Sequence, residues 1–307
     1  MRTSLIALSL IMSASAYADN TNWMSGLDDN QPVRTVSIPG AHDAATSSGV
    51  SNLSKTQSRN IIELFDAGVR AFDLRPKNGD LTIYHGIEST GIKLENVIKD
   101  LSAKIKDTDE FVIITIRNEG ANSDGDRDST WETAMEKLFN TYSDSFATWQ
   151  KGMTVGDARG KIIVLSRSQF NSNKVGFISN WNHNPEDIEA FISLGENRAR
   201  LYLQDNYDKP GDAEKQRNIK SMLDRSSSNS GKTEIQHWVI NHVSYTGSGL
   251  LSYPSTQAGT TNPVVLGYLT GGTGSTGIML MDFAGDDSYS GQKLVDAIIA
   301  RNTFKNN

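Results

Sequence analysis

The chain has 307 residues, of which 37% are hydrophobic and 21% are charged, a composition that is typical of a folded globular protein and argues against a disordered one. The formal charge of −6 makes general nucleic-acid binding unfavourable, because there is no excess of lysine and arginine to neutralise phosphates. The chain contains no cysteine, so packing alone must hold the fold.

The first 18 residues have the pattern of a secretory signal. Arg2 precedes an apolar run over 5–12, and small residues end at Ala18, where we expect cleavage. The run is too short to span a bilayer as a helix. A buried N-terminal helix is the alternative interpretation. The signal predicts a secreted protein, either extracellular or periplasmic.

Short β-rich runs then alternate with segments of helical spacing. The runs lie at 33–37, 69–74, 111–116, 161–166, 199–204, 235–241 and 277–282. Helical spacing is clearest at 60–67, 94–105, 131–142, 212–223 and 294–301. Near-continuous apolar strands between helices indicate an α/β fold with a parallel sheet covered on both faces. Seven strands and one undetected strand predict a single (β/α)8 barrel of the TIM type over residues 19–307, because no linker divides them.

Polar and ionisable side chains recur where the predicted strands end. They are His42, Asp43, Arg75, Arg117, Glu119, Arg167, Asp205, Tyr207 and Asp282. In a barrel these ends meet at one mouth, where active sites lie. Each residue alone is explained as well by a turn or a rim ion pair. The same coincidence on six strands predicts a site.

The residue types at this mouth suit phosphoryl transfer. Two imidazoles can act as base and acid because the histidine pKa lies near neutrality, and an arginine fork matches the oxygens of a phosphodiester. Of the five histidines, His42, His85 and His242 lie near predicted strand ends.

Several stretches resemble bacterial phosphatidylinositol-specific phospholipase C. The specific ones, in order, are Ser37-Ile38-Pro39-Gly40-Ala41-His42-Asp43, Gly68-Val69-Arg70-Ala71-Phe72-Asp73-Leu74-Arg75 and Tyr84-His85-Gly86. Weaker ones follow at 155–161, 204–207 and 281–283, so that the resemblance covers most of the chain after the signal.

The resemblance implies a distorted (β/α) barrel and a lyase reaction in two steps. The inositol 2-hydroxyl attacks phosphorus, which releases diacylglycerol and inositol 1,2-cyclic phosphate, and water then opens the cyclic ester slowly. His42 is the implied general base oriented by Asp282, His85 is the general acid with Asp43 as its partner, and Arg75 binds the phosphate. The implied inositol contacts are Arg117, Glu119, Arg167, Asp205 and Tyr207.

Arg75 also argues against a catalytic metal. A guanidinium supplies the positive charge that a calcium ion supplies in metal-dependent relatives, and the two would repel each other. We therefore expect no metal and no cofactor. Asp124, Asp126 and Asp128 alternate in a way that faintly resembles a calcium loop, but no bidentate glutamate completes it, so a solvated loop is the better interpretation.

Two local expectations concern loops. Asn78-Gly79 has the pattern of a two-residue hairpin turn, whose ideal pairing would leave His85 on the opposite face from Arg75. Pro76 cannot donate a backbone hydrogen bond to such a ladder, so a looser connection is expected. The segment from Asp43 to Arg59 is polar and lacks tryptophan, which leaves the loop of Leu250, Leu251, Tyr253 and Pro254 as the candidate for a peripheral, transient membrane contact.

Two other functions remain open. One is a metal-dependent glycerophosphodiester phosphodiesterase, which Arg75 opposes. The other is a secreted inositol- or glycan-binding protein without turnover. The preferred interpretation is a monomeric enzyme that acts on phosphatidylinositol and does not bind nucleic acid.

Overall fold

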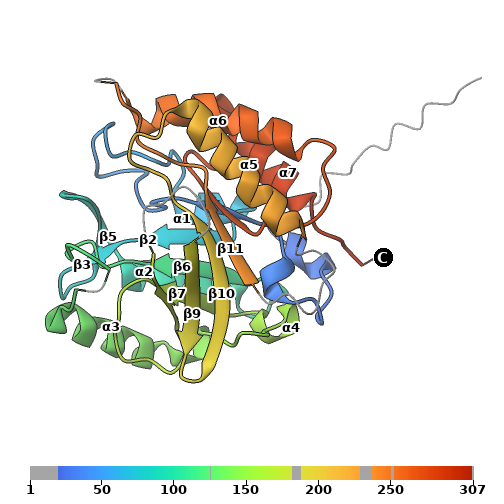
Figure 1. The fold of residues 1–307 in the computed structure, drawn as a ribbon. Helices are drawn as coiled ribbons and strands as arrows, with labels where there is room; N and C mark the ends of the chain where they lie inside the picture. Colours follow the sequence, from blue (N-terminus) through green and yellow to red (C-terminus); the bar gives the residue numbers. More distant parts are fainter. Residues whose placement is uncertain (1–19, 125, 182–187, 229–236, 250–251, 306–307) are drawn as a thin grey trace, which may run out of the picture.

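A closed barrel of nine strands forms the centre of the described chain (Figure 1). The computed structural model describes residues 20–305 except 125, 182–187, 229–236 and 250–251, so the predicted signal and the Leu250–Leu251 pair lie outside it. Around the barrel the strands run in the order β1-β12-β11-β10-β9-β8-β7-β6-β2. Their bounds are β1 Ile38–Ala41, β2 Ala71–Leu74, β6 Val112–Ile116, β7 Ile162–Ser166, β8 Gly176–Ser179, β9 Ile188–Leu194, β10 Asn197–Gln204, β11 His237–His242 and β12 Ile278–Met281.

One strand makes the barrel mixed rather than wholly parallel. β9 is antiparallel to both β8 and β10, whereas the other neighbouring pairs in the barrel are parallel. The barrel prediction is confirmed, but the strand number was wrong, because β8 and β9 were both missed. β9 returns to β10 through a two-residue turn at Gly195-Glu196, with Leu194 paired to Asn197. Alternating polar residues near this turn obscure the strand pattern.

The first strand lies later than the sequence indicates. Residues 33–35 form the 3-10 helix Val33–Thr35, and the strand is Ile38–Ala41, which contains a proline and a glycine. Gly40 is needed there because an added Cβ would meet the Leu280 side chain at 2.6 Å and the Ala71 Cβ at 3.0 Å. Close strand approach therefore explains residues that resemble a turn.

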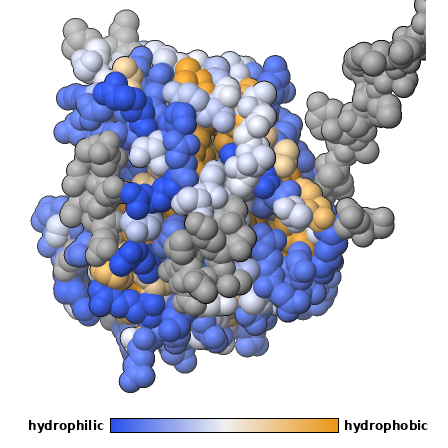
Figure 2. Space-filling model, turned by 45° about the vertical axis from the view of Figure 1, so that its right-hand side comes forward, coloured by the Kyte–Doolittle hydropathy of each residue, from blue (hydrophilic) through white to orange (hydrophobic). Residues whose placement is uncertain are grey.

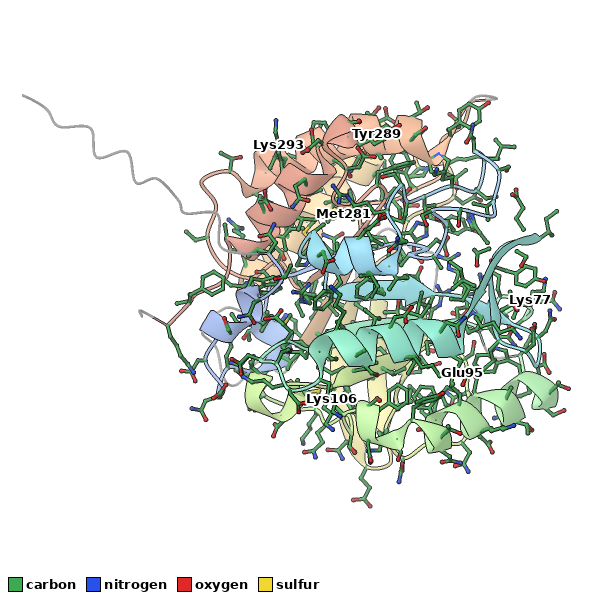
Figure 3. The ribbon with its side chains drawn as sticks, turned by 180° about the vertical axis from the view of Figure 1, so that it is seen from behind. Lys77, Glu95, Lys106, Met281, Tyr289 and Lys293 are labelled. Carbon is green, nitrogen blue, oxygen red and sulfur yellow. The ribbon has the colours of Figure 1, made fainter. Side chains whose placement is uncertain are left out.

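Helices cover the outside of the barrel. They are α1 Ile61–Asp66, α2 Leu94–Ile105, α3 Ser129–Thr141, α4 Val155–Ala158, α5 Asp212–Ser228, α6 Pro254–Leu269 and α7 Gly291–Ile299, with 3-10 helices Trp23–Gly26, Val33–Thr35, Ser143–Ser145 and Asp287–Tyr289. Viewed from behind, α2 and α3 cross one side, while α6 and α7 cover the opposite one (Figure 3). None of the helices in the described ranges is long and apolar enough to cross a membrane.

α6 was missed by the sequence interpretation because its buried face is partly polar. Gln257, Thr261 and Asn262 are buried alongside Val265 and Leu269, and Pro263 lies inside the helix. Asn262 Nδ2 donates to the carbonyl of Asp282 at 3.0 Å, so a polar residue of this stripe supports the strand end that carries a predicted site residue.

A small separate sheet carries His85. It consists of β3 Pro76–Lys77, β4 Thr82–His85 and β5 Glu88–Lys93 in the order β3-β4-β5. The looser connection expected in place of a two-residue turn is confirmed, because residues 78–81 form the connection and Lys77 pairs with Thr82. Arg75 lies between the barrel strand β2 and this sheet and belongs to neither strand, although its carbonyl accepts from the Tyr84 N–H of β4 at 3.0 Å. Both Arg75 and His85 nevertheless contact the Asp43 carboxylate.

Candidate active site

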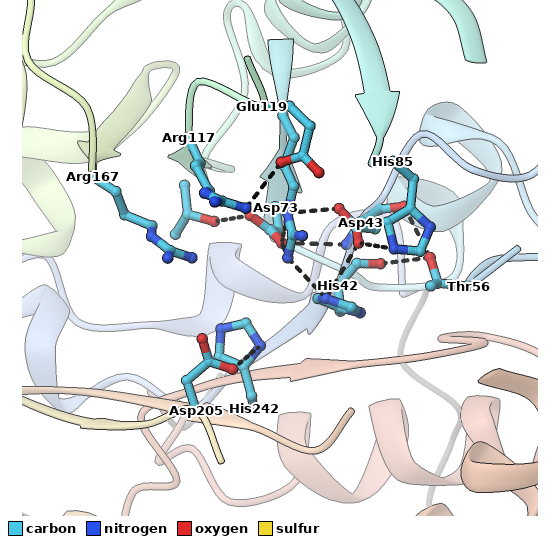
Figure 4. A network of polar contacts seen from close by, with 12 residues as sticks. His42, Asp43, Thr56, Asp73, His85, Arg117, Glu119, Arg167, Asp205 and His242 are labelled. Carbon is cyan, nitrogen blue, oxygen red and sulfur yellow. Dashed lines mark hydrogen bonds and ion pairs between the residues drawn. The ribbon is translucent and has the colours of Figure 1, made fainter. Parts of the chain in front are cut away.

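The predicted site residues meet in one cavity at the carboxyl ends of the barrel strands. The cavity measures about 280 Å³ and is lined by His42, Arg75, His85, Arg117, Glu119, Arg167, Asp205, Tyr207 and Asp282, with other residues. Asp43 does not line it and is buried directly beneath His42, Arg75 and His85. The histidines lie toward one end, and Arg117 and Arg167 lie toward the other (Figure 4).

His42 follows β1 and is held on both ring nitrogens. Its Nδ1 lies 2.8 Å from Asp282 Oδ1, and its Nε2 lies 3.0 Å from Arg75 Nη2 and 3.3 Å from Asp43 Oδ2. A guanidinium can only donate, so in this contact Nε2 accepts and Nδ1 carries the proton toward Asp282. A proton taken up at Nε2 would face Asp43. The geometry therefore suits a proton acceptor.

Charge around His42 strengthens it as a base. Burial alone would lower its pKa, but the carboxylates of Asp43 and Asp282 outweigh burial and raise the pKa of His42 to about 9. Burial also raises the pKa of Asp282, against the opposing effect of His42. Asp282 thus favours the imidazolium that forms when His42 accepts a proton.

Arg75 lies between two carboxylates at the centre of the site. Its Nε is 2.8 Å from Asp43 Oδ1, and its Nη2 is 3.0 Å from Asp73 Oδ2. Burial would lower the pKa of Arg75, but Asp43 and Asp73 raise it well above its usual value, so the guanidinium stays charged. Thr115 on β6 donates to Asp73 Oδ1 at 3.1 Å and holds that carboxylate in place. Asp73, which was not among the site residues predicted from the sequence, is part of this centre.

His85 reaches the same carboxylate from the small sheet. Its Nε2 lies 3.3 Å from Asp43 Oδ2, the same oxygen that His42 Nε2 approaches. Its Nδ1 lies 2.7 Å from the carbonyl oxygen of Ser54. A carbonyl only accepts, so Nδ1 donates and Nε2 is the nitrogen that faces the site. The two histidines thus face one another across Asp43, next to Arg75.

The far end of the cavity presents two braced arginines. Arg117 Nη1 binds Glu119 Oε2 at 3.1 Å, and Arg117 Nε contacts Asp124 Oδ1 at 3.3 Å. The other oxygen of Asp124 accepts from Arg167 Nε at 2.8 Å. The faint calcium loop is therefore not a cluster, because Asp126 instead accepts backbone N–H groups of 122 and 123, and Asp128 caps α3.

One aromatic residue of the site was missed by the sequence interpretation. Trp181 Nε1 donates to Asp205 Oδ2 at 2.8 Å, and its ring lies under the Arg167 guanidinium at 4.1 Å. Trp181 follows β8, which was also missed from the sequence. Because site residues were sought only after predicted strands, Trp181 was not considered. A tryptophan soon after an apolar run was the available signal. Tyr207 is 41% exposed at the rim, where an aromatic face can contact a sugar ring.

Two buried ionisable groups support the floor of the cavity. The His242 ring makes T-shaped contacts with the rings of His42 and Trp181, with 5.6 Å between ring centroids in each pair. Burial lowers the pKa of His242 to about 4. Lys215 on α5 donates to Gln204 Oε1 and to the Asn206 carbonyl at 2.9 Å each, and burial lowers its pKa to about 7. Both therefore favour their neutral forms more than usual.

His42, Asp43 and Asp73 form the one group in the described ranges whose potential ligand atoms are close enough to share a metal ion. Arg75 contacts all three, at 3.0 Å, 2.8 Å and 3.0 Å respectively. A cation bound by these atoms would have to displace or repel the guanidinium. The residues present therefore fit an arginine better than a metal, and metal independence stays a prediction.

Comparison with known proteins identifies related sequences. Residues 30–168 match the family model described as phosphatidylinositol-specific phospholipase C, X domain. A 1-phosphatidylinositol phosphodiesterase of Listeria monocytogenes is 25% identical over 280 residues, which cover 85% of this chain and 80% of the relative. Another from Staphylococcus aureus is 24% identical and covers 98% of both chains.

Solved structures share the fold. A mutant of the phosphatidylinositol-specific phospholipase C from Staphylococcus aureus superposes with a TM-score of 0.80 at 20% identity, covering 94% of this chain and 98% of the other. The enzyme of that name from Listeria monocytogenes superposes with a TM-score of 0.76 at 24% identity, covering 94% of this chain and 100% of the other. The overall fold is thus an architecture that these proteins have in common with this chain.

Proposed function

We propose that this chain, whose residues 30–168 match the phosphatidylinositol-specific phospholipase C X-domain model, cleaves phosphatidylinositol to diacylglycerol and inositol 1,2-cyclic phosphate. One observation carries the proposal. Two imidazole Nε2 atoms, of His42 and His85, each lie 3.3 Å from the same Asp43 oxygen, while Arg75 lies 2.8 Å from the other oxygen of that carboxylate. A base, an acid and a phosphate-binding cation therefore all lie next to the Asp43 carboxylate.

In the first step His42 Nε2 accepts the proton of the inositol 2-hydroxyl while that oxygen attacks phosphorus. The bond between phosphorus and the glycerol oxygen breaks, and His85 Nε2 gives its proton to the departing oxygen. Arg75 faces the non-bridging oxygens and stabilises the charge that develops on them. Asp282, 2.8 Å from His42 Nδ1, keeps the base in the tautomer whose Nε2 carries no proton.

In the second step the roles reverse. Neutral His85 accepts a proton from water, the water oxygen attacks phosphorus, and His42 returns its proton to the inositol 2-oxygen as the ring ester opens. The products are inositol 1-phosphate and the enzyme in its starting protonation state. Arg117, Glu119, Arg167 and Asp205 supply donors and acceptors for the other hydroxyls, and Tyr207 covers the ring at the rim.

The function is tested by incubating the purified protein with phosphatidylinositol in the presence of EDTA and following phosphorus products by NMR. We expect the cyclic phosphate to form first, at the same rate with and without the chelator. Activity that disappears with EDTA and returns with a divalent cation would favour the metal-dependent glycerophosphodiesterase. Inositol binding without any product would favour a binding protein.

We also propose that the protein is secreted and makes peripheral, transient contact with lipid. The sequence favours Leu250, Leu251, Tyr253 and Pro254 for this contact, but the exposed apolar side chains described at the mouth are Leu53, 64% exposed, and Ile87, 90% exposed. Leu53 lines the cavity, and Ile87 follows Gly86, which also lines it. Hydrophilic residues make up most of the coloured surface on the face seen in Figure 2. One similar solved structure, of the Staphylococcus aureus enzyme, concerns modulation of that protein's membrane binding.

The double substitution Leu53→Ser and Ile87→Ser should weaken binding to phosphatidylinositol vesicles about 30- to 700-fold, because insertion of each side chain contributes on the order of 1–2 kcal/mol. Turnover of a short-chain, monomeric substrate should stay unchanged. Phe304→Ser is the matched control, since Phe304 is 37% exposed and packs near Gly26, away from the cavity. Equal vesicle binding by the double variant and the wild type would rule out this contact.

A further inference from the structure

The orientation of His85 depends on one backbone carbonyl. His85 Nδ1 donates to the oxygen of Ser54 at 2.7 Å, and this contact directs Nε2 toward Asp43 and the cavity. The side chain of His85 is 25% exposed, so packing alone does not hold the ring. Whatever fixes the Ser54 carbonyl therefore also fixes the direction in which His85 presents its proton.

Glu88 fixes the turn that contains this carbonyl. Its Oε2 accepts from the backbone N–H of Ser51 at 2.5 Å, and its Oε1 accepts from the hydroxyls of Ser51 and Ser54 at 2.7 Å and 2.8 Å. The turn is closed by Ser54 N–H donating to the Ser51 carbonyl at 3.0 Å. These charge-assisted hydrogen bonds favour ionised Glu88 and lower its pKa, chiefly through the Ser51 N–H.

Glu88 also stands directly opposite His85 in the sheet. The two residues pair across the β4–β5 turn at Gly86-Ile87. The His85 ring binds the Ser54 carbonyl, Ser54 and Ser51 bind the Glu88 carboxylate, and Glu88 pairs with His85 in the sheet. Because this set of contacts connects the His85 ring to the backbone of His85 itself, it restrains the orientation of the ring.

The same segment is tied to the other histidine at its far end. Thr56 Oγ1 donates to the His42 carbonyl at 3.1 Å, and Gln57 Nε2 donates to it at 2.8 Å. Residues 51–57 therefore run from an anchor at Glu88, beside His85, to an anchor at His42. The span between the two imidazoles is set by this segment and its two anchors.

We propose that Glu88 is a positioning residue for the general acid, which holds His85 in its proton-donating orientation through the turn at 51–54. Glu88 is not among the residues that line the cavity, and its carboxylate binds Ser51 and Ser54 rather than a group that faces the cavity. The proposal rests on the proposed function, because it needs His85 to protonate a leaving group.

The test exploits the leaving group. Diacylglycerol is a poor leaving group, because its alkoxide must be protonated as it departs, whereas p-nitrophenolate leaves readily without a proton. Glu88→Ala should lower kcat on phosphatidylinositol about 10- to 100-fold, because a misplacement of about 1 Å at a catalytic group costs up to about 100-fold. On p-nitrophenyl inositol phosphate the loss should stay within about threefold, since general-acid catalysis contributes little to that reaction. KM should change little on either substrate.

Two controls separate positioning from general damage. Glu95→Ala is the matched control, because Glu95 on α2 binds Tyr142 and Lys99 away from the cavity (Figure 3). It should leave both rates unchanged. In a His85→Ala background, Glu88→Ala should cause no further loss on phosphatidylinositol, because both changes remove the same proton donation.

The outcomes are distinct. Equal losses on both substrates would show a structural role for Glu88 and overturn the proposal, as would a full additive loss in the His85→Ala background. Wild-type rates for Glu88→Ala on phosphatidylinositol would also overturn it. A wild-type protein inactive on both substrates would instead refute the proposed function.

Discussion

Alanine in place of His42 is expected to lower kcat on phosphatidylinositol about 10³- to 10⁴-fold, at the upper end of what general acid–base groups contribute. The reason is that no other base in the described chain lies where His42 Nε2 does, between Arg75 at 3.0 Å and Asp43 at 3.3 Å. His85→Ala should cause a loss of similar size on the same substrate. Initial-rate assays of cyclic phosphate formation measure both.

The two variants should differ once the leaving group is activated. With p-nitrophenyl inositol phosphate, His42→Ala should remain severely impaired because the 2-hydroxyl still needs a base, while His85→Ala should recover much of its rate. His237→Gln serves as a control, because His237 begins β11 at the opposite end of the barrel. Near-wild-type turnover by either alanine variant on phosphatidylinositol, with a normal unfolding transition, would contradict the mechanism.

Replacement of Arg70 by methionine is expected to lower the free energy of unfolding by about 3–5 kcal/mol, because it leaves a buried carboxylate without its partner. Arg70 is fully buried at the start of β2, away from the cavity, and its Nε binds Glu110 Oε2 at 2.7 Å. Its other nitrogens donate to the carbonyls of Phe65, Val69, Asn20 and Thr21. Urea unfolding followed by tryptophan fluorescence measures the change.

The companion variant isolates the cause. Adding Glu110→Gln to Arg70→Met removes the unpaired charge and should restore part of the lost stability, whereas Glu110→Gln alone should be destabilising. The kcat of folded Arg70→Met should equal that of the wild type, because the ion pair lies at the end of the barrel opposite the site. Unchanged unfolding of Arg70→Met would show that the pair contributes no net stability.

Local sequence patterns were sufficient for much of the barrel and the site. Apolar runs such as that of β6, all buried, identify strands because a strand covered on both faces must be apolar along its length. The polar residues that follow such runs, including Arg75 and Arg167, lie in one cavity because parallel strands end at one face. The barrel topology is therefore enough to predict that polar residues after successive strands form one site, without knowledge of their contacts.

The sequence by itself therefore determined that His42, an arginine and several carboxylates follow the strands of an α/β barrel, and the resemblance added His85, which a separate small sheet carries. Only the tertiary structure decided which atoms meet. That His85 approaches the oxygen of Asp43 that His42 also approaches depends on the break between β2 and β3 at Arg75 and on a four-residue connection, neither of which periodicity encodes. The contacts of Asp124 and Glu88 join segments whose separation in the chain bears no relation to their distance in space. Such contacts are set by how whole elements pack, because each partner is placed by a different strand end.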